Sequence, residues 1–169
     1  MQQILNTPRL ILRTIENNDF EEIHRKIFSN FNVVKNTFGS ELFTLDETKD
    51  FLVKNANFNG SLGLSVIIEK QSNTILGLAG VLKCNYMDDN DYEIGFILQE
   101  ESWGKGYASE IAMAQINQVK DELKRNRVLA ASSPINKASI KTLESLGFTY
   151  EKNLETSRGE RLIYVMELK

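Results

Sequence analysis

The fold is decided by the stretch Glu100-Glu101-Ser102-Trp103-Gly104-Lys105-Gly106-Tyr107-Ala108-Ser109-Glu110. An apolar, aromatic-rich run at residues 92–98 precedes it and predicts a buried strand. Apolar residues recur at helical spacing after it and predict an amphipathic helix: Ala108, Ala112, Ile116, Val119 and Leu123. Gly104 and Gly106 allow the backbone to turn sharply between these two elements. Since the free amides and the dipole of a helix N-terminus favour anions, we expect this turn to bind phosphate.

Two well-known phosphate-binding turns fit this segment poorly. A P-loop requires two glycines separated by four residues, with Lys and then Ser or Thr after the second glycine, whereas Gly106 is followed by Tyr107. A dinucleotide-binding turn requires a third glycine, where this chain has Ser109. It also requires an acidic residue at the end of the next strand, which instead reads Ala131-Ser132-Ser133-Pro134. A turn that serves only the strand-to-helix geometry is the structural alternative.

A third kind of turn, that of an acyl-coenzyme A site, fits better. Trp103-Gly104-Lys105-Gly106-Tyr107-Ala108 resembles the Gln/Arg-x-x-Gly-x-Gly/Ala signature of the GNAT superfamily of N-acetyltransferases. Trp103 stands where many members carry Gln or Arg, and this form is typical of the RimJ/RimL branch of ribosomal-protein N-terminal acetyltransferases. Residues 136–148 resemble the second GNAT signature, Asn-x-x-Ser-x-x-x-x-Glu-x-x-Gly-Phe. The resemblance covers nearly the whole chain.

Composition predicts one soluble globular domain spanning residues 1–169. The hydrophobic fraction is 41%, the charged fraction 25% and the formal net charge −3, so neither nucleic-acid nor membrane-surface binding is indicated. One cysteine, Cys84, and one histidine, His24, are too few for a disulfide framework or a Cys/His zinc cluster, and no metal is expected. No apolar run approaches the ~20 residues of a membrane helix. Without a signal-peptide pattern, we expect a cytoplasmic protein.

The remaining segments predict an α+β fold, with a single mixed, largely antiparallel central sheet and helices on both faces. Strands are expected at residues 9–13, 62–68, 75–84, 92–98, 127–132, 148–152 and 162–168, and helices at 17–28, 44–55, 108–123 and 136–147. Residues 30–40 are expected to be irregular. Alternation of Leu62, Leu64, Val66 and Ile68 predicts a strand buried on one face. Gly77 and Gly80 predict a bulge or a close backbone approach.

The acidic segment at residues 85–91 contains Asp88, Asp89 and Asp91. It is expected to be a solvated turn. Calcium binding is a weaker interpretation, because the EF-hand spacing and its closing Glu are absent. Attraction of a cationic amine substrate is the other functional interpretation.

The GNAT resemblance implies a coenzyme site. Acetyl-CoA would lie between the strand of Glu93 and the following strand, which splay apart, with backbone groups of Ile97 and Leu98 facing its pantetheine. Asn136 matches the family's pantetheine-contacting Asn, and Ser139 matches a position that faces the coenzyme sulfur in this branch, where other members use a Tyr as general acid. Helix capping and first-turn solvation are the structural alternatives for these two residues. Backbone amides of the turn would hold the pyrophosphate: Trp103, Gly104, Lys105, Gly106, Tyr107, Ala108 and Ser109.

Acyl transfer to an amine requires a proton acceptor, because an alkylamine is mostly protonated at neutral pH. Glu93 is expected to be this base, directly or through water, because it interrupts an apolar strand. A solvated, outward-facing Glu93 is the alternative. Backbone amides at the splayed strand would stabilise the oxyanion. Cys84 is not expected to carry the acetyl group, since the family transfers it directly in a ternary complex.

The acceptor is the least constrained feature of the sequence. The branch resemblance favours a protein N-terminal amine, while polyamines, amino acids and aminoglycosides are rival acceptors. A coenzyme-binding module without catalysis is a further alternative. The choice of acceptor would depend on residues 30–43 and 85–91, and these segments contain no motif that identifies the acceptor. The oligomeric state is open, with a homodimer among the options.

Overall fold

The computed structural model describes residues 1–39, 41–87 and 90–169. In this part of the chain, eight strands form one sheet in the order β1-β2-β3-β4-β5-β6-β8-β7. The strands are β1 (Gln3–Asn6), β2 (Leu10–Arg13), β3 (Ser65–Glu69), β4 (Thr74–Cys84), β5 (Asp91–Leu98), β6 (Arg127–Ser132), β7 (Thr149–Thr156) and β8 (Gly159–Glu167). The α-helices are α1 (Phe20–Ile23), α2 (Phe31–Thr37), α3 (Leu45–Asn55), α4 (Tyr107–Asn117) and α5 (Lys137–Leu146). Short π-helical turns extend α1 (His24–Phe28) and α4 (Gln118–Glu122).

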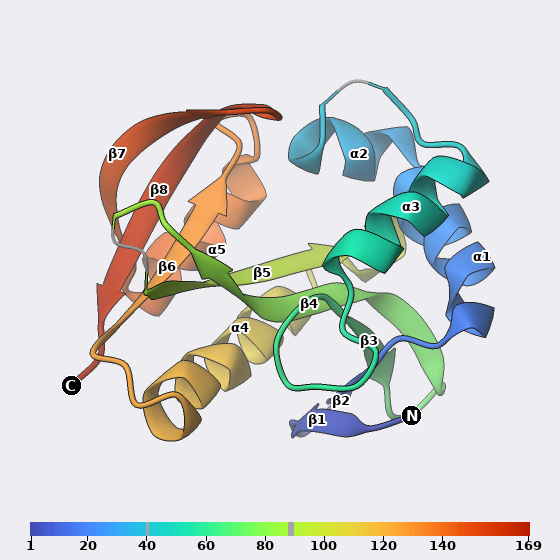
Figure 1. The fold of residues 1–169 in the computed structure, drawn as a ribbon, viewed down its shortest axis with the longest axis horizontal. Coiled ribbons are helices and arrows are strands. Elements are labelled where there is room, and N and C mark those ends of the chain that lie inside the picture. The colour runs from blue at the N-terminus through green and yellow to red at the C-terminus, as the bar shows by residue number, and fades with distance from the viewer. Residues whose placement is uncertain (40, 88–89) are drawn as a thin grey trace.

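The sheet is antiparallel except between β5 and β6. These two strands are parallel and share a single register pair, Glu93 with Leu129. Beyond this pair they diverge toward their carboxyl ends (Figure 1). The mixed sheet and its splayed central pair confirm the predicted fold class.

Helices cover both faces of the sheet (Figure 1). On one face, Phe28 and Leu52 from the α1–α3 region pack in one cluster with Val66 and Leu78 of the sheet. On the other face α4 and α5 share a cluster with the strands, which contains Ala112, Ile116, Val119, Leu143, Val81, Tyr92 and Ile94. Thr44 and Glu47 form a capping box at the start of α3, with both hydrogen bonds present.

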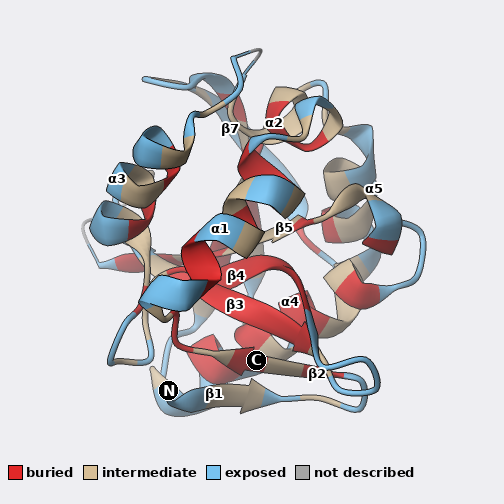
Figure 2. Ribbon diagram, turned by 90° about the vertical axis from the view of Figure 1, so that its right-hand side faces the viewer, coloured by how far each residue is buried: buried red, intermediate tan, exposed pale blue. Residues whose placement is uncertain are grey.

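The prediction that residues 62–68 alternate between core and solvent is wrong. The strand begins at Ser65, and its first four residues are all buried, because helices cover both faces of the central sheet (Figure 2). Leu64 forms only an isolated bridge with Ala56. A strand covered on both sides has no polar face, so alternation is not a reliable signal for it.

The predicted bulge and close approach at Gly77 and Gly80 are confirmed. The register between β3 and β4 shifts between Ile67 and Ile68. A Cβ on Gly77 would lie 2.0 Å from the carbonyl oxygen of Ile97, and one on Gly80 would lie 2.1 Å from that of Gly63. Neither site has room for a side chain.

The prediction that residues 30–40 are irregular is wrong, because they contain α2. Its N-cap is Asn30, whose side-chain oxygen accepts hydrogen bonds from the amides of Asn32 (2.9 Å) and Val33 (3.4 Å). Asn and β-branched residues have weak helix propensity, which hides this short helix in the sequence. Ser40 lies outside the described residues.

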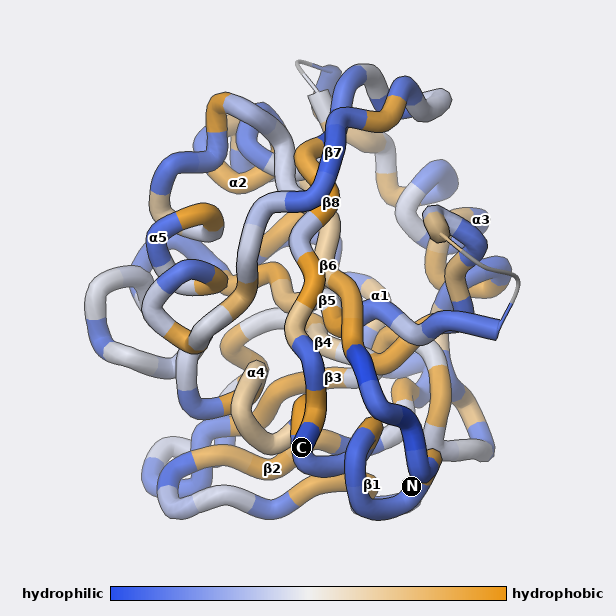
Figure 3. The backbone as a smooth tube through the Cα atoms, turned by 90° about the vertical axis from the view of Figure 1, so that its left-hand side faces the viewer, coloured by the Kyte–Doolittle hydropathy of each residue, from blue (hydrophilic) through white to orange (hydrophobic). Residues whose placement is uncertain are grey.

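Two further segments differ from expectation. Asp91 is not part of a solvated turn: it is buried at the start of β5 and pairs with Arg127 of β6 (2.7 Å). Asp88 and Asp89 lie outside the described residues. The β7–β8 hairpin is longer than predicted, because β7 continues to Thr156. β7 is a hydrophilic edge strand (Figure 3), which discourages pairing with other sheets.

Candidate active site

The glycine turn leaves the backbone amides at the N-terminus of α4 without a side-chain cap. Gly104 (φ +71°) and Gly106 (φ +79°) both adopt the left-handed conformation, and residues 103–106 are exposed. Gly106 is the N-cap of α4, and no side chain caps it. The amides of the first helical turn, Tyr107, Ala108 and Ser109, therefore have no side-chain acceptor, which leaves them for an anion.

Arg9 and Glu110 fix this turn from both sides. Arg9 lies just before β2 and donates from Nη1 to the carbonyl of Lys105 (2.8 Å) and from Nε to Glu110 Oε2 (2.6 Å). Glu110 Oε1 accepts from Thr7 Oγ1 (2.5 Å) and from the Arg9 amide (2.8 Å). Partial burial raises the pKa of Glu110, but these hydrogen bonds outweigh it and hold the pKa below its ordinary value. The two residues are far apart in sequence, and no sequence pattern predicted their contact.

Two aromatic residues anchor the ends of the turn. The Trp103 indole donates from Nε1 to the carbonyl of Leu98 (3.0 Å), and the residue is 42% exposed. Tyr107 is buried, and its hydroxyl donates to Glu69 of β3. Its ring also lies 4.4 Å from the Arg9 guanidinium. Lys105, between the glycines, is exposed.

The backbone groups of successive β5 residues point alternately toward β4 and toward the gap between β5 and β6, which we call the splay. The amide of Gln99 donates to the carbonyl of Leu76 (2.8 Å), and Ile97 is paired with Leu78 two residues earlier. In an antiparallel ladder such residues direct their backbone groups to the same partner strand. The backbone groups of Ile97 therefore belong to the β4 ladder, whereas those of Phe96 and Leu98 face the gap toward β6.

Glu93 is half-buried at the closed end of the splay, on the sheet face that α1–α3 cover. Tyr86 Oη donates to its Oε1 (3.1 Å). Burial raises the pKa of Glu93, and the Tyr86 hydrogen bond and the positive charge of Arg158 offset this only in part. A carboxyl group in this state accepts a proton more readily than an ordinary surface carboxylate. Tyr86 and Arg158 were not predicted from the sequence.

Two other residues bear on the chemistry. Burial raises the pKa of Cys84 to about 12, so its thiol stays protonated and is a poor nucleophile. His24 Nδ1 lies 2.9 Å from Thr48 Oγ1 in the contact between the α1 extension and α3.

Asn136 and Ser139 lie together at the start of α5. Asn136 is the predicted N-cap: its Oδ1 accepts from the Ser139 amide (3.1 Å). Both residues are half-buried. α5 packs on the α4 face of the sheet, whereas Glu93 points to the opposite face. The structure therefore places Glu93 and Ser139 on either side of the splay rather than in contact.

Residues 9–149 match the family model of the acetyltransferase (GNAT) domain. The chain belongs to the GNAT acetyltransferases. It is 29% identical to the uncharacterized N-acetyltransferase p20 of Bacillus licheniformis, over 98% of this chain and 96% of that protein. The fold of this GNAT protein matches that of a GNAT-family acetyltransferase from Bacillus anthracis with a TM-score of 0.80, at 26% identity over 98% of both chains.

Two coenzyme A complexes share the GNAT fold at lower identity. Spermidine N-acetyltransferase from Vibrio cholerae, solved with CoA and spermine, has a TM-score of 0.73 at 21% identity, over 94% of this chain and 95% of that one. RimL, the ribosomal L7/L12 alpha-N-protein acetyltransferase, has a TM-score of 0.74 at 16% identity, over 99% of this chain and 98% of that one. These identities show a common fold.

Family membership makes this GNAT protein an acyltransferase that uses acetyl-CoA as co-substrate. Among residues 1–39, 41–87 and 90–169, no cluster of three or more His, Cys, Asp or Glu side chains is arranged to hold a metal ion. The helices of this part of the chain are all too short or too polar to cross a membrane.

Proposed function

We propose that this GNAT enzyme acetylates a protein N-terminal α-amine by direct attack on acetyl-CoA in a ternary complex, as a cytoplasmic, single-domain member of the RimJ/RimL branch. The observation that carries the proposal is the uncapped N-terminus of α4 at the glycine turn, next to the gap between β5 and β6. This arrangement places an anion-binding helix N-terminus beside a gap between strands in which the pantetheine of acetyl-CoA can lie. The Trp103–Ala108 signature supports the branch.

The coenzyme binds along the splay in this proposal. Backbone amides of Trp103–Ser109 hold the pyrophosphate, and Lys105 adds positive charge. Backbone groups of Phe96 and Leu98 face the pantetheine from β5, and the Asn136 side chain faces it from the start of α5. The Leu98 carbonyl already accepts from Trp103, so its amide is the group that remains for the coenzyme. Ile97 contributes through its position in the strand rather than through free backbone groups.

The chemistry follows from Glu93. The ammonium group of the acceptor gives a proton to Glu93, directly or through water, and the neutral amine then attacks the thioester carbonyl. Amides at the splayed edge of β5 stabilise the oxygen that becomes negative. The carbon–sulfur bond breaks as the amide forms, the attacking nitrogen loses its extra proton, and the leaving thiolate takes up a proton, with the Ser139 hydroxyl as the predicted relay. The protonated Cys84 has no part in this sequence.

The similarity to solved structures bears on the acceptor in two directions. The RimL structure is that of an alpha-N-protein acetyltransferase, and another structure of similar fold is a spermidine N-acetyltransferase. The signature at the glycine turn favours the first kind. A small amine is the rival acceptor, and dimerisation stays a prediction.

Release of free thiol from acetyl-CoA tests the proposal. The assay compares a panel of peptides with free N-termini, spermidine and an aminoglycoside. We expect turnover with peptides, and a loss of at least about tenfold in Glu93→Gln with coenzyme affinity unchanged. Glu122→Gln, an exposed carboxylate beyond α4, is the matched control. Coenzyme binding without thiol release from any amine contradicts catalysis, and turnover confined to spermidine or the aminoglycoside contradicts the acceptor.

A further inference from the structure

Arg161 is a buried cation whose hydrogen-bond partners, within the part of the chain that the structure describes, are backbone carbonyls. Its side chain is 6% exposed, and it donates to the carbonyls of Glu160 (2.8 Å) and Thr37 (3.0 Å). In the described residues, other arginines with restricted exposure have carboxylate partners: Arg13 binds Asp19 with two hydrogen bonds, and Arg127 pairs with Asp91. No carboxylate among the described residues pairs with Arg161. A buried charge without a counter-ion is costly, which points to a ligand that supplies one.

The strand register places Arg161 at the open end of the splay. On β8, Arg161, Ile163 and Val165 face the same side, and Val165 pairs with Leu129, the β6 partner of Glu93. Arg161 is thus on the same sheet face as Glu93, and it lies beyond the end of β6, where Ser132 pairs with Leu162.

The Arg161 guanidinium also bridges two parts of the fold. Its bond to Thr37 reaches the C-terminus of α2, so it spans from the β7–β8 hairpin to the helices of the opposite half. Figure 1 shows the end of this hairpin beside α2. Arg161 therefore lies on the same sheet face from which an acceptor would approach Glu93.

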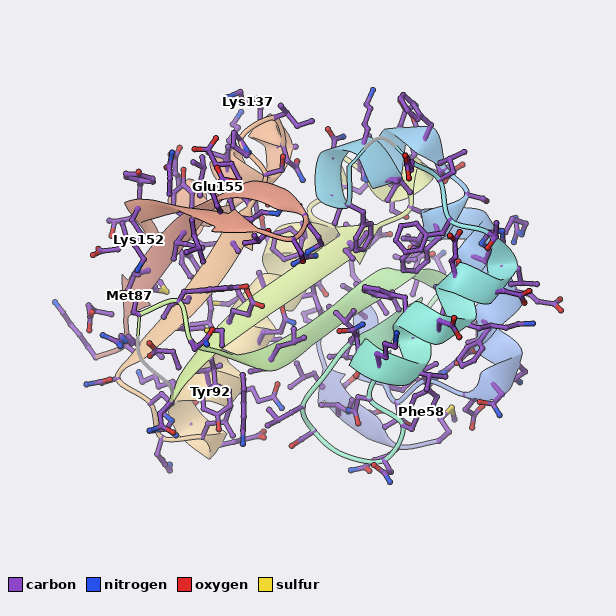
Figure 4. The ribbon with its side chains drawn as sticks, turned by 45° about the horizontal axis from the view of Figure 1, so that its top comes forward. Phe58, Met87, Tyr92, Lys137, Lys152 and Glu155 are labelled. Carbon is purple, nitrogen blue, oxygen red and sulfur yellow. The ribbon has the colours of Figure 1, made fainter. Side chains whose placement is uncertain are left out.

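A second cation, Arg158, and a group of apolar residues lie near Arg161 of the β7–β8 hairpin. Arg158, in the β7–β8 turn, lies 6.0 Å from the Phe38 ring, and its charge reaches both Glu93 and Arg161. Met87 and Leu154 pack against the buried cluster that contains Leu129 and Ile163, and Met87 is labelled beside the β7–β8 hairpin in Figure 4. Two cations here repel a polyamine and attract an anion.

We propose that Arg161, assisted by Arg158, binds a carboxylate of the acceptor, so that the accepted amine carries an acidic group close to its amino group. This inference rests on the proposed acetyl transfer and narrows its substrate class. A free α-amino acid has this chemistry, and so does a peptide N-terminus with an acidic side chain in its first residues. A planar guanidinium pre-held by two carbonyls suits such a group, since it binds carboxylates in bidentate fashion.

Paired acceptors test the inference. One pair is alanine and alaninamide, and the other is two peptides that differ only in Asp or Asn at the second residue. We expect the wild type to favour the acidic member of at least one pair by about tenfold or more in kcat/KM, as a charge-assisted hydrogen bond would give. Which pair responds distinguishes the free amino acid from the peptide. Arg161→Met brings the ratio close to one and leaves coenzyme affinity unchanged.

Three further variants keep the test decisive. Arg161→Lys retains the charge and part of the preference, and the exposed Arg158→Gln lowers it without disturbing the core. Arg125→Gln, an exposed arginine over the Tyr92 ring on the α4 face, leaves the ratio as in the wild type. Equal kcat/KM within both pairs, or a ratio that survives both Arg161→Met and Arg158→Gln, overturns the inference alone. Absence of thiol release with every acceptor overturns the proposed function and this inference with it.

Discussion

Substitution of Gly104 by alanine separates the coenzyme role of the glycine turn from its structural role. Gly104 has φ +71°, and nothing lies within 4 Å of the position of an added Cβ. The methyl group therefore meets no clash, and the cost is that of a left-handed alanine, roughly 1–2 kcal/mol. For a chain of this size, that lowers Tm by about 2–8 °C. The loop relieves the strain by leaving this conformation, which moves the amides that the proposal assigns to the pyrophosphate.

Gly159, the first residue of β8 after the β7–β8 turn, supplies a matched control. Its φ is +85°, and its added Cβ also meets nothing within 4 Å. Gly159→Ala and Gly104→Ala are therefore expected to lose similar stability. By titration calorimetry, only Gly104→Ala weakens acetyl-CoA binding, by about tenfold, equivalent to ~1.4 kcal/mol. Equal affinity in both variants, with Tm lowered in both, would refute the assignment of the turn to the coenzyme.

Three other predictions follow from the same structure. Burial raises the pKa of Glu93, so the folded state holds this proton more tightly than the unfolded chain. The stability that this proton contributes is complete below the ordinary carboxyl pKa and is lost as pH rises through the folded one. The Tm of Glu93→Gln relative to wild type should therefore rise between pH 4 and pH 8, and a constant difference would show that the pKa is not raised. Asn136→Ala removes the N-cap of α5 and should cost about 1 kcal/mol in urea unfolding, whereas exposed Asn126→Ala should cost little; equal losses would contradict the capping role. Gly77→Ala forces a methyl group toward the Ile97 carbonyl, 2.0 Å away, and should destabilise the protein by roughly 1–3 kcal/mol or more. An unchanged unfolding midpoint would show that β4 and β5 are not in close contact there.

The local features of the fold could be predicted from the sequence. The capping box of Thr44 and Glu47, the Asn136 cap and the left-handed Gly147 each depend on a few neighbouring residues, and all are present in the structure. The β5–turn–α4 unit is equally local. The short helix α2 was missed because its residues have weak helix propensity, and only its N-cap indicates a helix.

The long-range contacts of the site could not be predicted in this way. The Arg9–Glu110 pair joins residues 101 positions apart, and the Arg161–Thr37 bond joins residues 124 positions apart. Neither has a periodic or spacing signal, because each depends on how the sheet brings its edges together. Burial of β3 on both faces likewise depends on helices that are distant in sequence.

Thermal unfolding in the presence of acetyl-CoA tests the central claim most directly, with NAD as the control ligand. A ligand that binds only the folded state adds ~2.7 kcal/mol at about a hundred times its Kd, which raises Tm by roughly 5–11 °C for a protein of this size. We predict this rise with acetyl-CoA and none with NAD. A folded protein whose Tm does not respond to acetyl-CoA would contradict the coenzyme site at the glycine turn and the catalytic roles built on it.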